Sequence, residues 1–386
     1  MSDDTTFSEQ FPSSEQSTFS AQSPSPEQPA SLEQSPSPQQ PTSSSLSPSR
    51  LALLGWDVRV DTELRPLADE LLPGRVVRVE RGSCVVALAD GDHPARATTT
   101  VTVGDWVGAR RLDDGLAVET VAPRRSQLSR RDPEGRLQIL AANIDLVFIA
   151  APADRLSPAR IERETAMAWD SGAQPIVLLT KFDLGEPGLA EGLEARLPGT
   201  RFIETSVVTG AGIDQVSALL RPAATGVLLG PSGAGKSSLV NALVGAERLA
   251  VGDVRAGDRR GRHTTTVRQL VVVPGGGVLI DTPGLRSLTL AGEEGITAAF
   301  ADIDELAGGC RYSDCRHERE PGCAVTAAVE TGQLAPARIA NYRKLLRELA
   351  FQARHDDPLA RAEAERVWKL RSKAARQISR RKGGRR

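Results

Sequence analysis

The sequence predicts a multidomain protein with three folded parts in a row: a small β-barrel, an α/β domain with a parallel sheet, and a helical segment that holds a metal ion. Three observations predict this architecture. Short β-rich runs follow one another closely between residues 74 and 121. Strand-like and helix-like runs alternate from residue 144 to 243 around a glycine-rich loop. Three cysteines and one histidine lie close together between residues 310 and 323.

The bulk composition fits this architecture. A chain of 386 residues is long enough for two or three domains, and a hydrophobic content of 40% supports ordinary cores. The formal net charge of −1 argues against a chain that is basic throughout. No apolar run is long enough to cross a bilayer and no signal peptide is recognisable, so we expect a cytoplasmic protein without a membrane partner.

The two ends of the chain have biased compositions. Residues 1–48 are dominated by Ser, Pro and Gln, which bury too little apolar surface to offset the entropy lost on ordering, so we expect a disordered extension of undecided role. Residues 356–386 form a basic tail, with eight Lys or Arg and no acid from Arg371 onwards. The tail either contacts RNA phosphates or is simply solvated.

Residues 51–126 are predicted to form a barrel of the oligonucleotide-binding (OB) type. The expected strands are the β-rich runs 75–79, 84–88, 98–103, 106–109 and 116–121. Two interpretations stay open, an RNA-contacting module and a spacer packed on its neighbour, because Trp106 is the one aromatic residue in these runs. Four arginines that follow could meet phosphate or lie in a solvated linker: Arg124, Arg125, Arg130 and Arg131.

The α/β domain is predicted to span residues 127–290. The apolar runs 144–150, 175–179 and 227–229 indicate strands buried on both faces, and helical stretches lie between them. Such alternation predicts a parallel sheet, whose ligands bind beyond the carboxyl ends of the strands.

A phosphate-binding loop follows the third of these strands. Gly230, Gly235, Lys236 and Ser237 match G-x-x-x-x-G-K-[ST], in which glycines let backbone N–H groups surround an anion and the next helix turns its positive end to phosphate. The residues expected to contact the nucleotide phosphates are Gly230, Pro231, Ser232, Gly233, Ala234, Gly235, Lys236, Ser237 and Ser238.

A guanine-binding motif is predicted at the end of the preceding strand, in Thr180-Lys181-Phe182-Asp183. The Asp183 carboxylate can accept hydrogen bonds from N1–H and the 2-amino group of guanine, a donor pair that adenine lacks. Lys181 can lie along the base, and Ser206 is expected behind it. The G-protein consensus has Asn where this chain has Thr180, so weaker affinity with guanine preference retained is expected.

Magnesium is expected beside the phosphate loop. Asp281, in Asp281-Thr-Pro-Gly284, fits the carboxylate that holds Mg²⁺ through water, and Gly284 offers an N–H to the γ-phosphate. Ser237 and Thr265 are expected to complete the metal shell, with Thr264 and Thr266 as near alternatives.

The order of the motifs and one missing residue are unusual. The guanine motif precedes the phosphate loop, which indicates a circularly permuted domain. Leu285 stands where Ras-like enzymes have the glutamine that orients water. His263 is the candidate catalytic residue in its place, because a histidine titrates near neutral pH; a solvent-facing loop histidine is the alternative.

The predicted helical domain, residues 291–355, carries the metal-ligand pattern. Cys310, Cys315, His317 and Cys323 supply three thiolates and one imidazole, a closed tetrahedral set typical of one structural Zn²⁺. Residues 335–353 are predicted to form an amphipathic helix.

Together these residues resemble the ribosome small-subunit-dependent GTPase A family of bacteria, from about Gly74 to Gln352. The motifs that carry the likeness are Val103-Gly-Asp-Trp-Val107, Pro123-Arg-Arg-Ser126, Ala141-Ala-Asn143, Gly261-Arg-His-Thr-Thr265, Asp281-Thr-Pro-Gly284 and the zinc cluster. The resemblance implies an OB barrel, a permuted GTPase domain and a zinc domain.

It also implies hydrolysis of GTP to GDP in late maturation of the 30S subunit, stimulated by the subunit. We therefore expect a monomer whose partners are the 30S subunit and its 16S rRNA. A GTP-occupied RNA-binding assembly chaperone with incidental hydrolysis is the alternative. A generic phosphate-loop ATPase is a weaker third hypothesis.

Overall fold

The computed structural model describes residues 49–67, 70–80, 82–113, 115–132, 136–186, 189–194, 197, 199–245, 268–281, 288–290 and 292–356. Several predicted features lie outside these ranges: the extension 1–48, His263, the threonines 264–266, Gly284 and the tail from residue 357. Within the described ranges, no helix is both long enough and apolar enough to cross a membrane.

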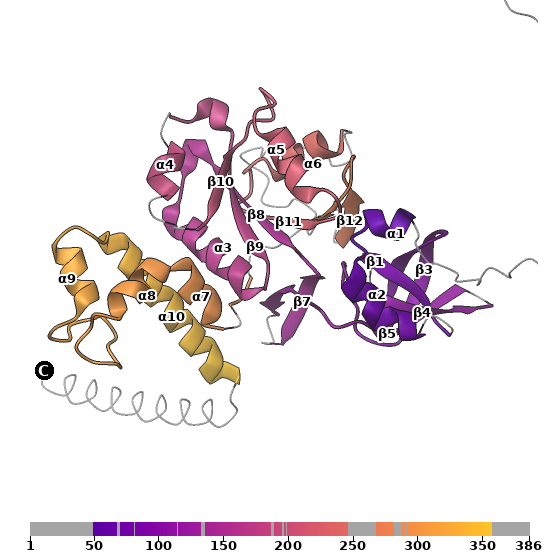
Figure 1. Cartoon of the computed structure of the whole chain (residues 1–386), viewed down its shortest axis with the longest axis horizontal. Coiled ribbons are helices and arrows are strands. Elements are labelled where there is room, and N and C mark those ends of the chain that lie inside the picture. The colour runs from indigo at the N-terminus through magenta and orange to yellow at the C-terminus, as the bar shows by residue number, and fades with distance from the viewer. Residues whose placement is uncertain are drawn as a thin grey trace, which may run out of the picture. The chain divides into compact units, whose positions relative to one another are not determined.

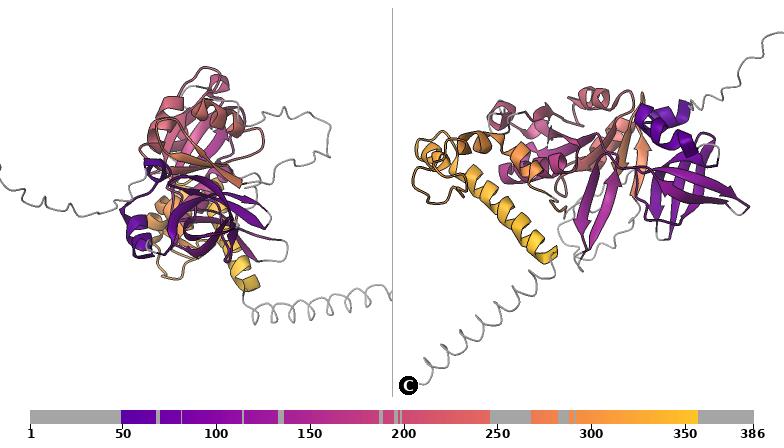
Figure 2. Two further views of the ribbon diagram at one scale, coloured as in Figure 1. Left: turned by 90° about the vertical axis from the view of Figure 1, so that its right-hand side faces the viewer. Right: turned by 60° about the horizontal axis from the view of Figure 1, so that its bottom comes forward.

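Two short helices precede a five-stranded barrel (Figure 1). The elements are α1 (Ser49–Leu53), α2 (Val58–Leu64), β1 (Leu72–Glu80), β2 (Ser83–Leu88), β3 (Gly91–Ala97), β4 (Trp106–Leu112) and β5 (Gly115–Val121). Strand β1 pairs with both β2 and β4, and β3 runs parallel to β5, so the order β1-β2-β3-β5-β4 closes on itself. The curved strands are seen end-on in Figure 2. The predicted OB-type barrel is confirmed.

The third barrel strand was predicted in the wrong place. The β-branched run 98–103 is not a strand, and β3 lies just before it, where Cys84 pairs with Ala95 across a tight turn from β2. The run instead leads into a corner in which the buried Asp105 carboxylate accepts the Thr102 N–H at 2.8 Å. Pairing with β2 therefore outweighs the β propensity of the threonines.

Two helices and one hairpin in the N-terminal half of the chain have no counterpart among the predicted strands and helices. Helices α1 and α2 cover the barrel, and α2 begins at Asp57, whose carboxylate accepts N–H groups of Arg59 and Val60. A two-stranded hairpin follows the barrel, formed by β6 (Gln127–Arg131) and β7 (Leu137–Ala142).

A six-stranded sheet forms the α/β domain, in the order β10-β9-β8-β11-β13-β12. All neighbours are parallel except β12 and β13. The strands are β8 (Leu146–Pro152), β9 (Gln174–Thr180), β10 (Arg201–Glu204), β11 (Thr225–Leu229), β12 (Arg268–Val272) and β13 (Val278–Asp281). The helices are α3 (Pro158–Asp170), α4 (Leu189–Glu194), α5 (Ile213–Leu220) and α6 (Lys236–Val244). Strand β1 also pairs with β12 through Val79 and Arg268, so barrel and sheet are continuous.

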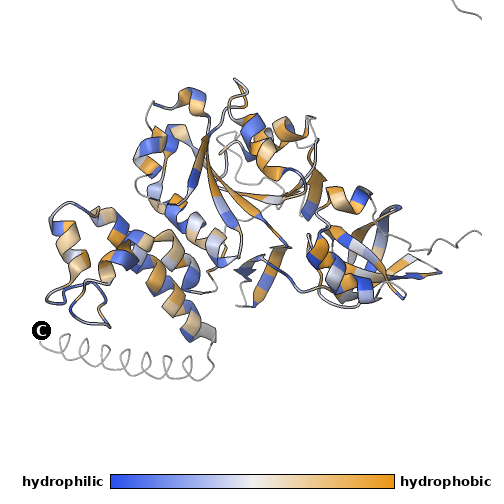
Figure 3. Ribbon diagram, viewed as in Figure 1, coloured by the Kyte–Doolittle hydropathy of each residue, from blue (hydrophilic) through white to orange (hydrophobic). Residues whose placement is uncertain are grey.

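Both faces of this sheet are buried, as the apolar runs predict. Along β8, Val147 and Ile149 enter the core on the α3 side, while Phe148 enters the core on the α5 and α6 side. Figure 3 shows hydrophobic residues along the sheet strands. The α3-side core continues into the C-terminal helices, which are α7 (Glu294–Ala299), α8 (Ala301–Ala307), α9 (Ala324–Glu330) and α10 (Pro336–Asp356).

A buried arginine, Arg75 of β1, joins the barrel to the α/β domain. Its guanidinium donates to Thr225 Oγ1 at 2.9 Å, to Asn143 O at 3.2 Å and to Gly104 O at 3.3 Å, and it also bonds Leu54 O. Burial lowers its pKa to about 10, so the group still carries its charge at neutral pH. We name this set of contacts the barrel junction.

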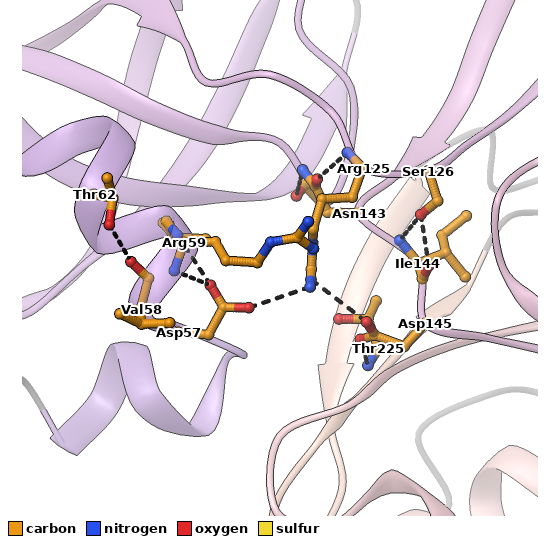
Figure 4. A network of polar contacts seen from close by, with 12 residues as sticks. Asp57, Val58, Arg59, Thr62, Arg125, Ser126, Asn143, Ile144, Asp145 and Thr225 are labelled. Carbon is orange, nitrogen blue, oxygen red and sulfur yellow. Dashed lines mark hydrogen bonds and ion pairs between the residues drawn. The ribbon is translucent and has the colours of Figure 1, made fainter.

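The neighbouring arginines belong to the same junction. Arg124 bonds the buried Asp105 carboxylate through two nitrogens, at 2.7 and 2.8 Å. Arg125 lies between Asp57, at 3.2 Å, and Asp145, at 3.4 Å (Figure 4). Both side chains are therefore held in ion pairs within the protein, which is neither of the two alternatives that the sequence left open.

A second buried arginine, Arg338 of α10, joins the C-terminal helices to α3. It bonds Asp302 of α8 at 2.5 and 2.6 Å and Glu162 of α3 at 3.2 Å. Asn341 donates to the other oxygen of Glu162 at 2.6 Å, and Arg163 pairs with Glu348 nearby. Arg338 is 2% exposed and Glu162 1%. We name this set of contacts the helix junction.

Candidate nucleotide and metal sites

The predicted phosphate loop connects β11 to α6. Gly230, Gly233 and Gly235 have φ values of 131°, 74° and 82°, which L side chains rarely adopt. A Cβ atom on Gly230 would lie 2.5 Å from Ala150 O, so the loop backbone also passes too close to β8 for a side chain. Lys236 Nζ donates to Gly230 O at 2.9 Å and Pro231 O at 2.7 Å. The lysine therefore lies over the loop at the start of α6, where helix N–H groups favour an anion.

Asp281 lies at the end of β13, the strand beside β11. Burial raises the pKa of its carboxyl group, and the positive charge of Lys236 acts in the opposite direction. The Asp281 carboxylate is thus close enough to the phosphate loop for the charge of Lys236 to affect its pKa. Of the three predicted magnesium ligands, Ser237 lies in the first turn of α6 and Asp281 at the end of β13, while Thr265 lies outside the described residues.

The residues of the predicted guanine motif are linked to one another and to the phosphate loop. Thr180 is buried, and its hydroxyl donates to Ala234 O at 2.8 Å. Lys181 adopts a left-handed backbone conformation, with φ of 56°. Asp183 Oδ1 accepts a hydrogen bond from Ser206 Oγ at 2.5 Å, so the serine orients the carboxylate that is expected to read guanine.

The Thr180 contact could not be read from the motif alone. The prediction considered only the amide that Thr180 lacks relative to the consensus asparagine, yet the threonine hydroxyl bonds the phosphate loop directly. The strand order β9-β8-β11 brings the ends of β9 and β11 to the same edge of the sheet. The two motifs are therefore fixed to each other despite their reversed order in the chain.

Two residues beside this site were not predicted. Lys181 Nζ lies 3.6 Å from Asp154 Oδ2, and Arg155 Nη2 donates to Ser232 O at 3.3 Å. Both Asp154 and Arg155 belong to the short turn after β8, residues 153–155. Their position at the carboxyl end of a buried parallel strand is the signal that could have found them.

The four predicted metal ligands come together in the C-terminal helices. The ligand atoms of Cys310, Cys315, His317 and Cys323 all lie within 4.8 Å of one another. His317 Nδ1 is 3.6 Å from the sulfurs of both Cys310 and Cys323, and those two sulfurs are 3.9 Å apart. Tetrahedral zinc with ordinary bond lengths would separate sulfur from nitrogen by roughly 3.6 Å and sulfur from sulfur by roughly 3.8 Å. The cluster can hold a metal ion, and its spacing fits zinc.

Cys323 also lies at the beginning of α9. Burial alone would raise the pKa of its thiol, but hydrogen bonding, including the Thr326 N–H at 3.4 Å, lowers it to about 6. A thiolate at neutral pH is the form that binds metal. None of the four cysteines forms a disulfide.

Comparison with known proteins identifies the family. The sequence model of the family described as RsgA GTPase matches residues 121–291. The chain is 46% identical to "Small ribosomal subunit biogenesis GTPase RsgA" of Streptomyces coelicolor, over 84% of this chain and 93% of that one. Among solved structures it resembles YjeQ from Thermotoga maritima, with 26% identity, a TM-score of 0.54, and 72% and 98% of the two chains covered.

A second structure bears on the strand order. YloQ, described as a circularly permuted GTPase, matches with a TM-score of 0.52 and 24% identity, over 73% of this chain and 96% of that one. This likeness concerns the fold and agrees with the guanine motif preceding the phosphate loop. The predicted fold class and family resemblance are therefore confirmed, and the chain belongs to the RsgA GTPase family, whose members are hydrolases acting on GTP.

Proposed function

We propose that this chain hydrolyses GTP to GDP and phosphate in late maturation of the 30S ribosomal subunit, binding the subunit and its 16S rRNA with GTP bound and leaving after hydrolysis. The observation that carries the proposal is the hydrogen bond from Thr180 to the phosphate loop. It fixes the guanine motif to the triphosphate site, so that one nucleotide can span both. The relatives named for small-subunit biogenesis support the choice of partner.

The proposed roles follow from the chemistry of each group. Asp183, oriented by Ser206, reads guanine, while Lys236 and the loop N–H groups bind the phosphates. Ser237 and Asp281 would hold Mg²⁺, whose positive charge would offset that of the nucleotide phosphates. His263, Thr265 and Gly284 keep their predicted roles, in positioning water, completing the metal shell and donating to the γ-phosphate.

We further propose that the metal cluster binds one structural Zn²⁺, because a closed set of three sulfurs and one nitrogen leaves no position open for a substrate. The same proposal includes a monomeric protein that works in the cytoplasm, where 30S subunits are assembled.

The test is steady-state hydrolysis of GTP and ATP by the full chain, with and without purified 30S subunits. We expect slow GTP turnover that rises strongly with subunits, and no ATP turnover. GTP turnover that ignores the subunit would contradict the proposed partner. Equal turnover of ATP would contradict the guanine site.

Asp183→Asn sharpens the nucleotide assignment. An amide can donate to the 2-oxo group of xanthine but cannot accept both donors of guanine. The variant should therefore lose GTP turnover and gain turnover of xanthosine triphosphate. Glu186→Gln, six residues beyond the end of β9, removes a nearby exposed carboxylate and should leave the preference for GTP unchanged.

A further inference from the structure

Arg155 lies beside the phosphate loop but belongs to none of the predicted motifs. It ends the short turn after β8, and its Nη2 donates to Ser232 O at 3.3 Å. A Cβ atom on the next loop residue, Gly233, would lie only 2.8 Å from the same Nη2. The guanidinium therefore covers the middle of the loop, between Gly230 at its start and Lys236 at its end.

The charge of Arg155 is only weakly compensated. Among the described residues it forms an ion pair with Asp154, with 3.8 Å between Nε and Oδ1. Asp154 also pairs with Lys181, with 3.6 Å between Oδ2 and Nζ. One carboxylate thus lies between two cations. The arginine side chain is 55% exposed, and a guanidinium has five N–H donors, of which the bond to Ser232 occupies one. Donors and positive charge remain for an anion held by the loop.

We propose that Arg155 is a phosphate-contacting residue of the nucleotide site, which stabilises the charge that develops on the terminal phosphates during hydrolysis. The inference rests on the proposed function, since it takes GTP as the nucleotide in the loop. In the reaction, water oxygen bonds to the γ-phosphorus and the bond from phosphorus to the β–γ bridging oxygen breaks. That oxygen keeps the electron pair and leaves with GDP, and the water proton ends on the phosphate product.

A cation beside the loop acts on this step because negative charge accumulates on the leaving oxygen as the bond breaks. Lys236 already serves one end of the loop through its carbonyl contacts at Gly230 and Pro231. Arg155 approaches from the turn after β8, the parallel neighbour of β11, and lies over Ser232 and Gly233. The two cations would thus flank the phosphates from two elements of the sheet, and the arginine is supplied by the chain itself.

The competing structural role is a brace that only supports the loop through Ser232 O. Three substitutions separate the two roles. Arg155→Gln keeps an N–H donor for the carbonyl but has no charge, Arg155→Lys keeps the charge without the planar fork, and Arg155→Ala removes both. A brace makes the glutamine variant resemble the wild type, whereas a charge-stabilising residue makes it resemble the alanine variant.

The experiment measures two quantities for the full chain with Mg²⁺ and 30S subunits. One is the turnover number for GTP. The other is the affinity for GDP with aluminium fluoride, which imitates the transferring phosphoryl group, relative to GDP alone. We expect Arg155→Gln and Arg155→Ala to lower turnover and analogue affinity by about 10- to 100-fold, with GDP affinity within about twofold of the wild type. Arg155→Lys should recover part of the loss.

Arg160→Ala is the matched control. Arg160 lines the same cleft of about 200 Å³ as Arg155 and Pro231, and no described hydrogen bond joins its side chain to the phosphate loop. The Arg160→Ala substitution also removes one positive charge from this cleft. It should change the turnover number and the affinity for GDP with aluminium fluoride by less than about twofold. Unchanged analogue affinity in Arg155→Gln, or a loss shared equally by GDP, would overturn the proposal.

Lys236→Ala separates this proposal from the proposed function. It should abolish binding of GTP and GDP. Nucleotide binding that survives Lys236→Ala would contradict the nucleotide site itself, whatever the Arg155 variants do. Normal behaviour of the Arg155 variants beside an inactive Lys236 variant would refute the role of Arg155 alone.

Discussion

The barrel junction and the helix junction are both built around one buried arginine, but they satisfy it with different acceptors. Arg75 bonds three backbone carbonyls and one hydroxyl, all of them neutral. Arg338 bonds two carboxylates, Asp302 and Glu162, and one carbonyl. The pKa of Arg75 falls to about 10 because burial is not matched by a bonded anion.

The difference determines what is left behind when either arginine is removed. Loss of Arg75 leaves neutral groups, some of which water can reach once the junction loosens. Loss of Arg338 removes the guanidinium that bonds both Asp302 and Glu162, and the Glu162 residue is only 1% exposed. Removing one partner of a buried ion pair costs more than removing a donor from a neutral carbonyl, so the helix junction should be the more sensitive of the two.

The largest effect is expected for Arg338→Met. The free energy of unfolding of the C-terminal helices should fall by about 3–5 kcal/mol, because one partner of a buried ion pair is removed and the other stays. Scanning calorimetry should show these helices melting separately from the sheet. The double variant Arg338→Met with Glu162→Gln should recover a large part of the loss, since it also removes the buried negative charge of Glu162. A double variant no more stable than the single one would contradict the argument.

A smaller effect is expected for Arg75→Met, about 1–3 kcal/mol, because hydrogen bonds to neutral acceptors are lost while the cost of burying a charge is also removed. Urea unfolding followed by tryptophan fluorescence measures it, since Trp56 and Trp106 pack together in the barrel. Arg78→Met on the same strand, whose side chain is 47% exposed, should change stability by less than about 0.5 kcal/mol. Equal effects of the two substitutions would remove the special role of Arg75.

The smallest effect concerns Glu164, two residues after Glu162 on α3. Its Oε2 is buried without a hydrogen-bond partner in the described structure. Burial raises its pKa from 4.5 to about 7, although Arg160, Lys236 and Arg163 act in the opposite direction. Glu164 and Lys344 of α10 both line a second cleft, beside the helix junction residue Asn341.

Because the folded-state pKa is raised, the contribution of the protonated group to stability is complete below about pH 4.5 and is lost as the pH rises through 7. Glu164→Gln cannot ionise. It should match the wild type near pH 5 and exceed it by about 1–2 kcal/mol at pH 8, a figure reduced for the partial exposure of the side chain. Urea titrations at the two pH values measure this difference. A constant difference across the range would contradict the assignment.

Short sequence patterns predicted the phosphate loop, the buried sheet strands and the metal cluster. Each of these features depends on residue types at short spacing in the sequence, as in the strands at Val147 and Val227, so distant contacts do not change it. The strand predicted at residues 98–103 failed because pairing with β2 and the corner at Asp105 decided the register. Tertiary contacts of this kind are not visible in a propensity.

The two junctions escaped prediction for the same reason. The partners in each junction are far apart in the sequence. Arg75 and Thr225 are separated by 150 residues, and Arg338 and Glu162 by 176. A single arginine in a β-rich run reads as a surface residue until its partners are known. The motifs at residues 103–107, 123–126 and 141–143 were recognised by resemblance, but their contacts show that they also build the barrel junction.

The central position of β11 in the sheet determines the order in which the strands can pair while the chain is being synthesised. Among the strands of this sheet, β8, β9 and β10 leave the ribosome first, together with Asp183. Strand β11 follows and pairs with β8, but its other neighbour, β13, has not yet been synthesised. The link between barrel and sheet likewise forms only when β12 is available to pair with β1. We expect the nascent chain to hold an incomplete sheet with an open edge beside β11 until residue 281 has emerged, so Asp281 is the last of the described residues of the nucleotide site to reach its place.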